Sequence, residues 1–382
     1  MTVTKFESIW TGTTPVTDYP ELSKDLVVDV IIIGGGITGI NAAYFLKSQG
    51  QKVAIIEANK IATGTSGNTT AKITSLHELR YAYLMKKFGK NSAQIYADAN
   101  QWAIKEVENI INKEDIECDF VKAPAFTYTR TKRDLDRIKQ EVEAAKDLNL
   151  PASFVTEIQN FPFGIFGAVK FDNQAYFHPR KYLLKLAEKI NIFEKTRALD
   201  IKEGSSFCEV KTNRKNIRGK FIIIATNFPF YDPYGIFTKI YRTGSYALAA
   251  RVAKIPDGMF LGAQGDDLSF RPHNEWLIIG GKHHNIDEIG NINERFNELV
   301  KLANKDFQIS STDYMWGAQD TMSLDQVPYI GKMPQAKRIF VATGFSAWGM
   351  TTGVLAAKLL TDLILERKND WQEFYSPARL RR

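Results

Sequence analysis

One glycine-rich segment constrains the fold of this chain more than any other. Residues 28–57 place three glycines, Gly34, Gly36 and Gly39, directly after an apolar run that ends at Ile33. The run predicts a parallel strand buried on both faces, and Gly34 permits the sharp turn that must follow it. Gly36 has no Cβ, so its backbone can approach a pyrophosphate, and Gly39 allows the next helix to pack closely on the strand. The phosphates would then lie at the N-terminus of that helix, where free N–H groups and the helix dipole favour negative charge.

A carboxylate at the end of a second apolar run completes this pattern. Residues 53–56 are apolar, and Glu57 follows them, 23 residues after Gly34. At this distance an acidic side chain can accept hydrogen bonds from the ribose of an adenosine, and it repels a 2′-phosphate. The alternative interpretation is a glycine-rich turn in an ordinary strand-to-helix unit. The strand before the turn, the helix after it and the acid at this spacing together favour dinucleotide binding.

The length and composition are those of a globular protein with more than one domain. With 382 residues, 44% of them hydrophobic, the chain can bury a large core, and we expect two domains. The net charge is +7, but the Lys and Arg residues are spread along the sequence and mixed with acidic residues, which argues against a nucleic-acid partner. Residues 1–19 lack the apolar core of a signal peptide, and the apolar stretch 354–365 contains Lys358 and Asp362, which favours a packed helix over a membrane span. We therefore expect a cytoplasmic protein.

The cysteines and histidines do not predict a metal site. Cys118 and Cys208 lie far apart, no CxxC motif is present, and the five histidines include one adjacent pair. A zinc quartet or an iron–sulfur cluster needs more ligands in register, so we expect no metal and two reduced thiols. His178 is a weak ligand candidate, because its place before Pro179 is more typical of the start of a helix.

The periodicity of apolar residues divides the rest of the chain into helices and strands. Helices are expected over 76–112, 134–148, 178–190, 292–305 and 352–366. Strands are expected over 125–129, 198–210, 220–226, 246–252, 259–261, 268–271, 276–279 and 338–344. The strand-like segments between 241 and 281 predict a second domain built on an antiparallel sheet. Apolar strands that end in small residues recur near 225 and 343, which indicates a nucleotide-binding domain assembled from separate parts of the chain.

Motifs spread over nearly the whole chain are similar to those of one flavoprotein family. They are residues 29–57, GTSGNTTAKIT (64–74), FHP (177–179), WGAQD (316–320) with DQVPYIG (325–331), and VATGFSAWGMTTG (341–353). In these motifs the chain resembles the DAO family of D-amino-acid, glycine and sarcosine oxidases. The resemblance is greatest to bacterial oxidoreductases in which this module precedes a Rieske iron–sulfur domain. Those relatives continue past a segment like 374–379 into CxH and CxxH ligand pairs, whereas this chain ends at Arg382. Either a separate electron carrier or a truncated form accounts for the difference.

The resemblance implies an α/β fold with an α+β second domain. A discontinuous Rossmann-like FAD-binding domain is assigned to residues 25–80, 150–235 and 330–370. An antiparallel-sheet substrate domain is assigned to residues 81–149 and 236–329, and residues 1–24 and 371–382 are assigned to terminal tails.

The resemblance also implies a cofactor, non-covalent FAD, and the residues that hold it. The N–H groups of residues 349–352 would face the pyrimidine edge of the flavin, where negative charge accumulates on reduction. Covalent attachment is not expected, because Asn68 stands where some relatives carry a flavin-linking His. The implied cofactor-binding residues are Gly34, Gly36, Ile37, Thr38, Gly39, Glu57, Ser66, Thr69, Thr70, Ala71, Lys72, Arg197, Ala198, Ala225, Thr226, Gly344, Gly349, Met350, Thr351 and Thr352.

Five residues are candidates for contact with the substrate: Arg242, Tyr246, Lys282, Trp348 and Gln319. Amino-acid oxidases of this family usually hold the substrate carboxylate with an Arg, but the corresponding position here is Gln319 or Asp320. Arg242 is a possible substitute, with a structural ion pair as the alternative. Sarcosine oxidases also carry a mid-strand Lys that promotes the reaction with oxygen, and Ile278 stands there in this chain. Lys282 lies just beyond, where a polar strand end is the alternative.

Three functions follow from the resemblance. The first is an FAD-dependent oxidoreductase that takes hydride from a C–N bond of a small amine or amino acid derivative and passes electrons to O2 or to a separate carrier. The second is an electron-transfer flavoprotein module with a non-amine donor. The third is a non-catalytic flavin-binding protein, which the missing carboxylate-binding Arg favours.

Overall fold

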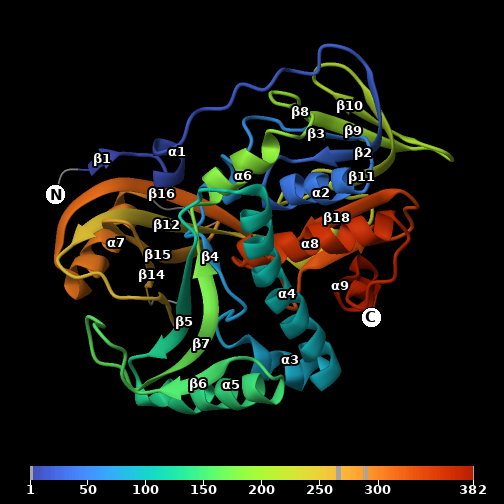
Figure 1. Ribbon diagram of the computed structural model, residues 1–382. Helices are drawn as coiled ribbons and strands as arrows, with labels where there is room; N and C mark the ends of the chain where they lie inside the picture. Colours follow the sequence, from blue (N-terminus) through green and yellow to red (C-terminus); the bar gives the residue numbers. More distant parts are fainter. Residues whose placement is uncertain (1–2, 264–267, 287, 289–290, 382) are drawn as a thin grey trace.

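Two sheets organise the chain (Figure 1). The computed structural model describes residues 3–263, 268–286, 288 and 291–381. The eight-stranded sheet has the order β17-β18-β11-β2-β3-β8, with β10 beside β11 and β9 beside β10. Its strands are β2 (Leu26–Ile33), β3 (Val53–Ile56), β8 (Ile192–Phe193), β9 (Ala198–Glu203), β10 (Cys208–Thr212), β11 (Ile217–Ile224), β17 (Tyr329–Lys332) and β18 (Ile339–Thr343).

The second, ten-stranded sheet has the order β1-β16-β12-β15-β14-β13-β5-β7-β4, with β6 beside β7. Most neighbouring strands in it are antiparallel, the parallel pairs being β1 with β16 and β13 with β5. Its strands are β1 (Val3–Lys5), β4 (Lys72–Ile73), β5 (Val121–Thr129), β6 (Ala152–Val155), β7 (Gly167–Tyr176), β12 (Ile240–Val252), β13 (Met259–Gly262), β14 (Ser269–His273), β15 (Trp276–Asn285) and β16 (Ile309–Ser323).

Strand β2 lies inside the first sheet, parallel to β3 and to β11. Val30 and Ile32 belong to the core on one face, whereas Ile31 and Ile33 belong to the core on the other. Because both faces are covered, the strand is apolar at successive positions instead of alternating. The α/β fold with a second, largely antiparallel sheet is therefore confirmed.

Helix α2 (Ile37–Ser48) follows the glycine turn and packs on the sheet beside α8 (Gly349–Ile364) (Figure 1). A Cβ on Gly39 would lie 1.9 Å from the carbonyl oxygen of Gly34, so the helix and the turn touch at this point. A Cβ on Gly353 would lie 2.7 Å from Ile37. Glycines at these contacts allow the two helices to begin at the same edge of the sheet. No helix in the described part of the chain is long and apolar enough to cross a membrane.

The other helices are α1 (Ile9–Gly12), α3 (Arg80–Phe88), α4 (Lys90–Glu114), α5 (Leu135–Asp147), α6 (Pro179–Ala187), α7 (Ile292–Asp306) and α9 (Gln372–Tyr375). The helical segment expected over 76–112 consists of two helices, because Gly89 with φ +82° separates α3 from α4. This backbone conformation suits glycine and ends the hydrogen-bond ladder of α3.

Strands β7 and β16 have no counterpart among the expected strands. Strands β6 and β7, which lie inside the range 150–235 assigned to the FAD-binding domain, belong to the second sheet, where β7 pairs with β5 and β6 pairs with β7. The division into domains otherwise stays a prediction.

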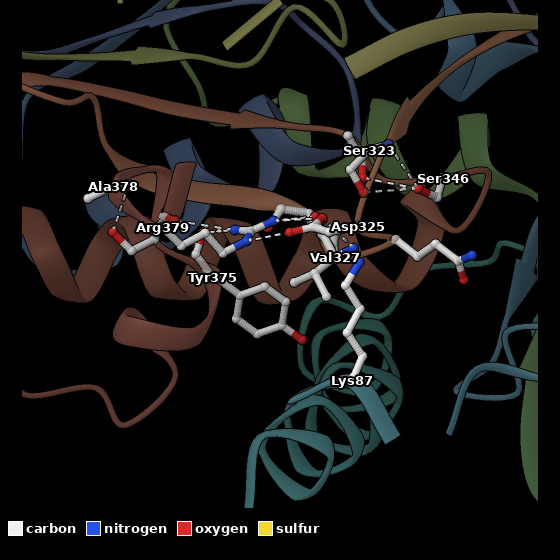
Figure 2. Close-up of polar contacts among 12 residues, drawn as sticks. Lys87, Ser323, Asp325, Val327, Ser346, Tyr375, Ala378 and Arg379 are labelled. Atoms are coloured by element: carbon white, nitrogen blue, oxygen red, sulfur yellow. Dashed lines mark hydrogen bonds and ion pairs between the residues drawn. The ribbon is translucent and has the colours of Figure 1, made fainter. Parts of the chain in front are cut away.

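The ends of the described chain are packed, so the expectation of terminal tails is wrong for them. Strand β1 pairs with β16, and the buried Trp10 donates its indole N–H to the carbonyl of Thr69 at 2.7 Å. At the other end Arg379 contacts the carboxylate of Asp325 (Figure 2), with Nε 2.9 Å from Oδ2. Residues 1, 2 and 382 of the predicted tails lie outside the described residues.

Candidate functional site

A cavity of about 670 Å³ opens where the carboxyl ends of β2, β3 and β11 meet β16 and the start of α8. Ligands of open α/β sheets bind at this edge of the strands. The lining residues come from within the segments 33–38, 56–60, 62–69, 196–198, 225–230, 317–321 and 345–350.

Glu57 lies at one end of the cavity and is held by two backbone donors. Its Oε2 accepts the N–H of Gly35 at 2.9 Å, and its Oε1 accepts the N–H of Asn59 at 2.8 Å. The carbonyl of Glu57 also accepts the N–H of Thr196 at 2.8 Å, which brings Arg197 to the same end. A carboxylate oxygen accepts more than one hydrogen bond, so the oriented carboxylate keeps capacity for ribose hydroxyls.

The middle of the cavity is formed by the glycine turn and a loop that closes on it. Gly36 is the N-cap of α2 and has no side chain to cap the first turn. The N–H of Ile37 donates to Ser66 Oγ at 2.9 Å, and a Cβ on Gly36 would lie 3.0 Å from the same oxygen. The N–H of Ile37 is thus bonded within the chain, while the helix N-terminus as a whole favours an anion at this position.

The start of α8 forms the wall at the other end. Gly349 and Met350 line the cavity, and the N-cap residue Trp348 makes no capping hydrogen bond with its side chain. Thr351 and Thr352 do not line it, because their N–H groups donate to the carbonyl of Trp348 at 3.2 and 3.0 Å. The hydroxyl of Thr351 instead bonds to the backbone of Thr74. The expectation that all four residues present N–H groups to the ligand is therefore wrong for these two.

Other implied cofactor-binding residues lie behind the wall as well. Thr70 uses its carbonyl to accept a hydrogen bond from Arg271 at 2.7 Å, and Lys72 is buried with its ammonium on Ser269. The residues that do not line the cavity are Gly39, Thr70, Ala71, Lys72, Gly344, Thr351 and Thr352. Those that do are Gly34, Gly36, Ile37, Thr38, Glu57, Ser66, Thr69, Arg197, Ala198, Ala225, Thr226, Gly349 and Met350.

Of the five candidates for substrate contact, only Gln319 lines the cavity. The exposed Arg242 places its guanidinium 5.1 Å from the ring centre of Phe228, and Lys282 forms an ion pair with Glu298 at 3.0 Å. Lys282 therefore has a structural partner outside the cavity, whereas Arg242 lies over the ring of Phe228, which belongs to the cavity lining.

The two aromatic candidates are also stacked elsewhere. Tyr246 of β12 is paired with Gly317 of β16, and its ring stacks on His284 with 5.4 Å between ring centres. Trp348 stacks on His77 at 4.6 Å. Neither ring is on the cavity lining.

Sequence reasoning missed several lining residues, among them Lys60, Thr65, Asn227, Phe228, Phe230, Thr321 and Phe345. Phe228 and Phe230 follow β11 in the chain. Their place just beyond the carboxyl end of a parallel strand is the sequence signal that could have identified them, because ligands of such sheets bind there. Lys60 is paired with the buried Glu194 at 3.0 Å, which ties the loop after β3 to the segment after β8.

Residues set aside as metal or thiol candidates lie outside the cavity. His178 is the N-cap of α6, as expected, and its Nδ1 accepts the N–H of Lys181 at 3.2 Å. Burial lowers the pKa of His178 to about 3. Cys118 and Cys208 are buried free thiols, and burial raises their pKa to about 12 and about 11.

The arrangement fits FAD. It offers an acid for an adenosine ribose, a glycine cradle that a Cβ would fill, and an uncapped helix N-terminus at the far end. Thr321 Oγ1, on the lining, is buried without a hydrogen-bond partner among the described residues, as expected where a ligand supplies one. Fold and site together define a dinucleotide-binding flavoprotein.

The chain belongs to the DAO family of FAD-dependent oxidoreductases, whose family model matches residues 29–363. A protein of Bacillus subtilis (strain 168) that carries the name Rieske 2Fe-2S iron-sulfur protein YhfW is 36% identical over 385 residues, covering 98% of this chain and 75% of that protein. Gamma-glutamylputrescine oxidoreductase of Escherichia coli (strain K12) is 21% identical, covering 95% and 88%. The structure of glycine oxidase from Geobacillus kaustophilus superposes with a TM-score of 0.79 at 17% identity, covering 92% and 98%.

Proposed function

We propose that this FAD-dependent oxidoreductase acts on the C–N bond of a small amine or amino acid derivative. The observation that carries the proposal is that the cavity lining reaches beyond the glycine cradle to Phe345 in the loop before α8 and to Gly317 of β16. We assign the small organic substrate to this part of the cavity. The names of the relatives, a gamma-glutamylputrescine oxidoreductase and a glycine oxidase, support an amine as the donor.

Bound FAD would supply the hydride acceptor, and the chain would supply binding and orientation. We assign Glu57, Arg197 and Ala198 to the adenosine, and the turn at Gly36 with Ser66 to the pyrophosphate. The N–H groups of Gly349 and Met350 would stabilise the negative charge that develops on the flavin, because the helix dipole adds to their effect.

The substrate end of the cavity needs little proton chemistry of its own. Phe345 and Gly317 would hold the amine against the flavin, and orientation of this kind lowers the entropy cost of the reaction. Electrons would then leave either to O2 or to a separate carrier, and the name of the Bacillus subtilis relative supports a Rieske protein as one such carrier.

The test is anaerobic mixing of the purified holoprotein with a panel of small amines and amino acids, followed by the loss of flavin absorbance near ~450 nm. Reduction by at least one amine supports the proposal. Reduction only by a protein donor would favour an electron-transfer module, and a flavin that no donor reduces would favour a non-catalytic protein.

A further inference from the structure

One carboxylate on the cavity lining, that of Asp320, has no hydrogen bond or ion pair with another residue in the part of the chain that the structure describes. Residues 317–321 of β16 form this wall, and the N–H of Ser346 donates to the carbonyl of Thr321 at 3.0 Å, which joins the wall to the loop before α8. Across the sheet Asp320 is paired with Thr243 of β12. Asp320 is half-buried, and what remains exposed of it lies on the cavity lining.

The carboxyl group of Asp320 lies in a desolvated position. Burial raises its pKa to about 6. The neighbouring Arg242 has its guanidinium over Phe228.

The other charged residues on the described lining are Glu57, Lys60 and Arg197. Lys60 is paired with Glu194, and Glu57 is held by Gly35 and Asn59 at the end assigned to the adenosine. Among the described lining residues, Asp320 is then the charged side chain that is not placed at the adenosine end, and it is negative; Arg242 lies over Phe228 without being on the lining itself. A partly buried carboxylate has lost part of its hydration and is stabilised by a cationic hydrogen-bond donor, whereas it repels a substrate carboxylate.

We propose that Asp320 forms a subsite for a second cationic group on the substrate, which makes the substrate class diamines and related amines with a distal ammonium or guanidinium. This inference rests on the proposed function, because it names the substrate class of the same site. The amine to be oxidised lies at the flavin, and the distal cation binds Asp320 by a charge-assisted hydrogen bond.

The test measures binding separately from turnover. Dissociation constants for 1,4-diaminobutane, 1-aminobutane and 4-aminobutyrate are obtained anaerobically by isothermal titration calorimetry of the holoprotein with its flavin reduced beforehand, so that it cannot accept hydride from the amine. Wild type, Asp320→Asn and Asp320→Lys are compared. We expect wild type to bind the diamine about 10- to 100-fold more tightly than the monoamine, in line with a charge-assisted contact. Asp320→Asn should bring the ratio to about one, and Asp320→Lys should favour 4-aminobutyrate.

A control and a second readout keep the inference distinct from the proposed function. Asp313→Asn removes a carboxylate of the same strand that is paired with Arg251 outside the cavity, and it should leave the ratio unchanged. An unchanged ratio in Asp320→Asn with full FAD content overturns the subsite. If instead the diamine binds in an Asp320-dependent way but no amine reduces the flavin, the subsite stands and the amine oxidoreductase proposal fails.

Discussion

The guanidinium of Arg379 forms a two-point contact with the carboxylate of Asp325, with Nε and Nη2 lying 2.9 and 3.3 Å from its two oxygens (Figure 2). Arg379 also donates to the carbonyl of Pro328 at 3.0 Å and lies 3.8 Å from the ring centre of Tyr329. The segment after α9 is thus attached to the loop that leads from β16 into β17.

Replacing Arg379 by Ala should therefore lower the free energy of unfolding by about 2–3 kcal/mol, because several acceptors lose a charged donor at a mostly buried position. Urea unfolding of both proteins measures the difference. Lys368→Ala, which removes an exposed ion pair with Asp370, should change the free energy of unfolding little. Equal effects of the two substitutions would contradict the structural role of Arg379.

Gly39→Ala should destabilise the first sheet. Its Cβ would lie 1.9 Å from the carbonyl oxygen of Gly34, and neither backbone can move without displacing α2 from the glycine turn. Overpacking of this kind costs about 1–3 kcal/mol. Thermal unfolding measures the loss, and Gly164→Ala is the control, since a Cβ there meets no atom within 4 Å. A Gly39→Ala protein as stable as wild type would show that the helix and the turn are not in contact.

Glu57→Gln should weaken the binding of FAD about 10- to 100-fold, because the ribose would lose a charged acceptor. The measurement is fluorescence titration of the apoprotein with FAD. FMN, which has no adenosine, should bind both proteins equally. Asp29→Asn, an acid whose carboxylate is bonded to Lys52 and Lys220 outside the cavity, is the matched control. A loss of FMN affinity in Glu57→Gln would indicate general damage instead of a ribose contact.

The stability of the protein should rise between pH 7 and pH 9.5 through Lys72. Burial, with the positive charge of Arg271, lowers the pKa of Lys72 to about 7 in the folded protein. The unfolded chain, with an ordinary lysine pKa near ~10.4, therefore binds one more proton in this range, and the folded state gains stability as the pH rises. The unfolding free energy of wild type should increase by up to about 3 kcal/mol more than that of Lys72→Met. The exposed Lys86→Met is the control, and a Lys72→Met protein with the wild-type slope would contradict the prediction.

Acid precipitation should release all of the flavin, because covalent attachment is not expected. Asn68 lines the cavity, but its side-chain nitrogen donates to the carbonyls of Thr63 and Gly64 at 3.1 and 3.0 Å. Cys118 and Cys208 are buried away from the cavity. The absorbance of the supernatant and of the resolubilised pellet measures the partition, and flavin that stays with the polypeptide would overturn the expectation.

The sequence by itself determined the nucleotide-binding half of this protein. The run before Gly34, the turn at Gly36 and the acid at Glu57 are close in the chain, and each residue type follows from a local requirement of backbone conformation, packing or ribose contact. The strands β2, β3 and β18 and the helix α8 followed from apolar periodicity for the same reason.

Only the tertiary structure decided the rest of the site. Strand β16 is paired over its length with β12, and that pairing, which links residues far apart in the chain, brings Asp320 and Gly317 to the cavity while Tyr246 stays behind them. Arg242 and Lys282 have the chemistry expected of substrate contacts, but neither lines the cavity: Arg242 lies over the ring of the lining residue Phe228, and Lys282 is paired with Glu298. Residue type sets which contacts a side chain can make, whereas long-range strand pairing and burial select the contact it does make.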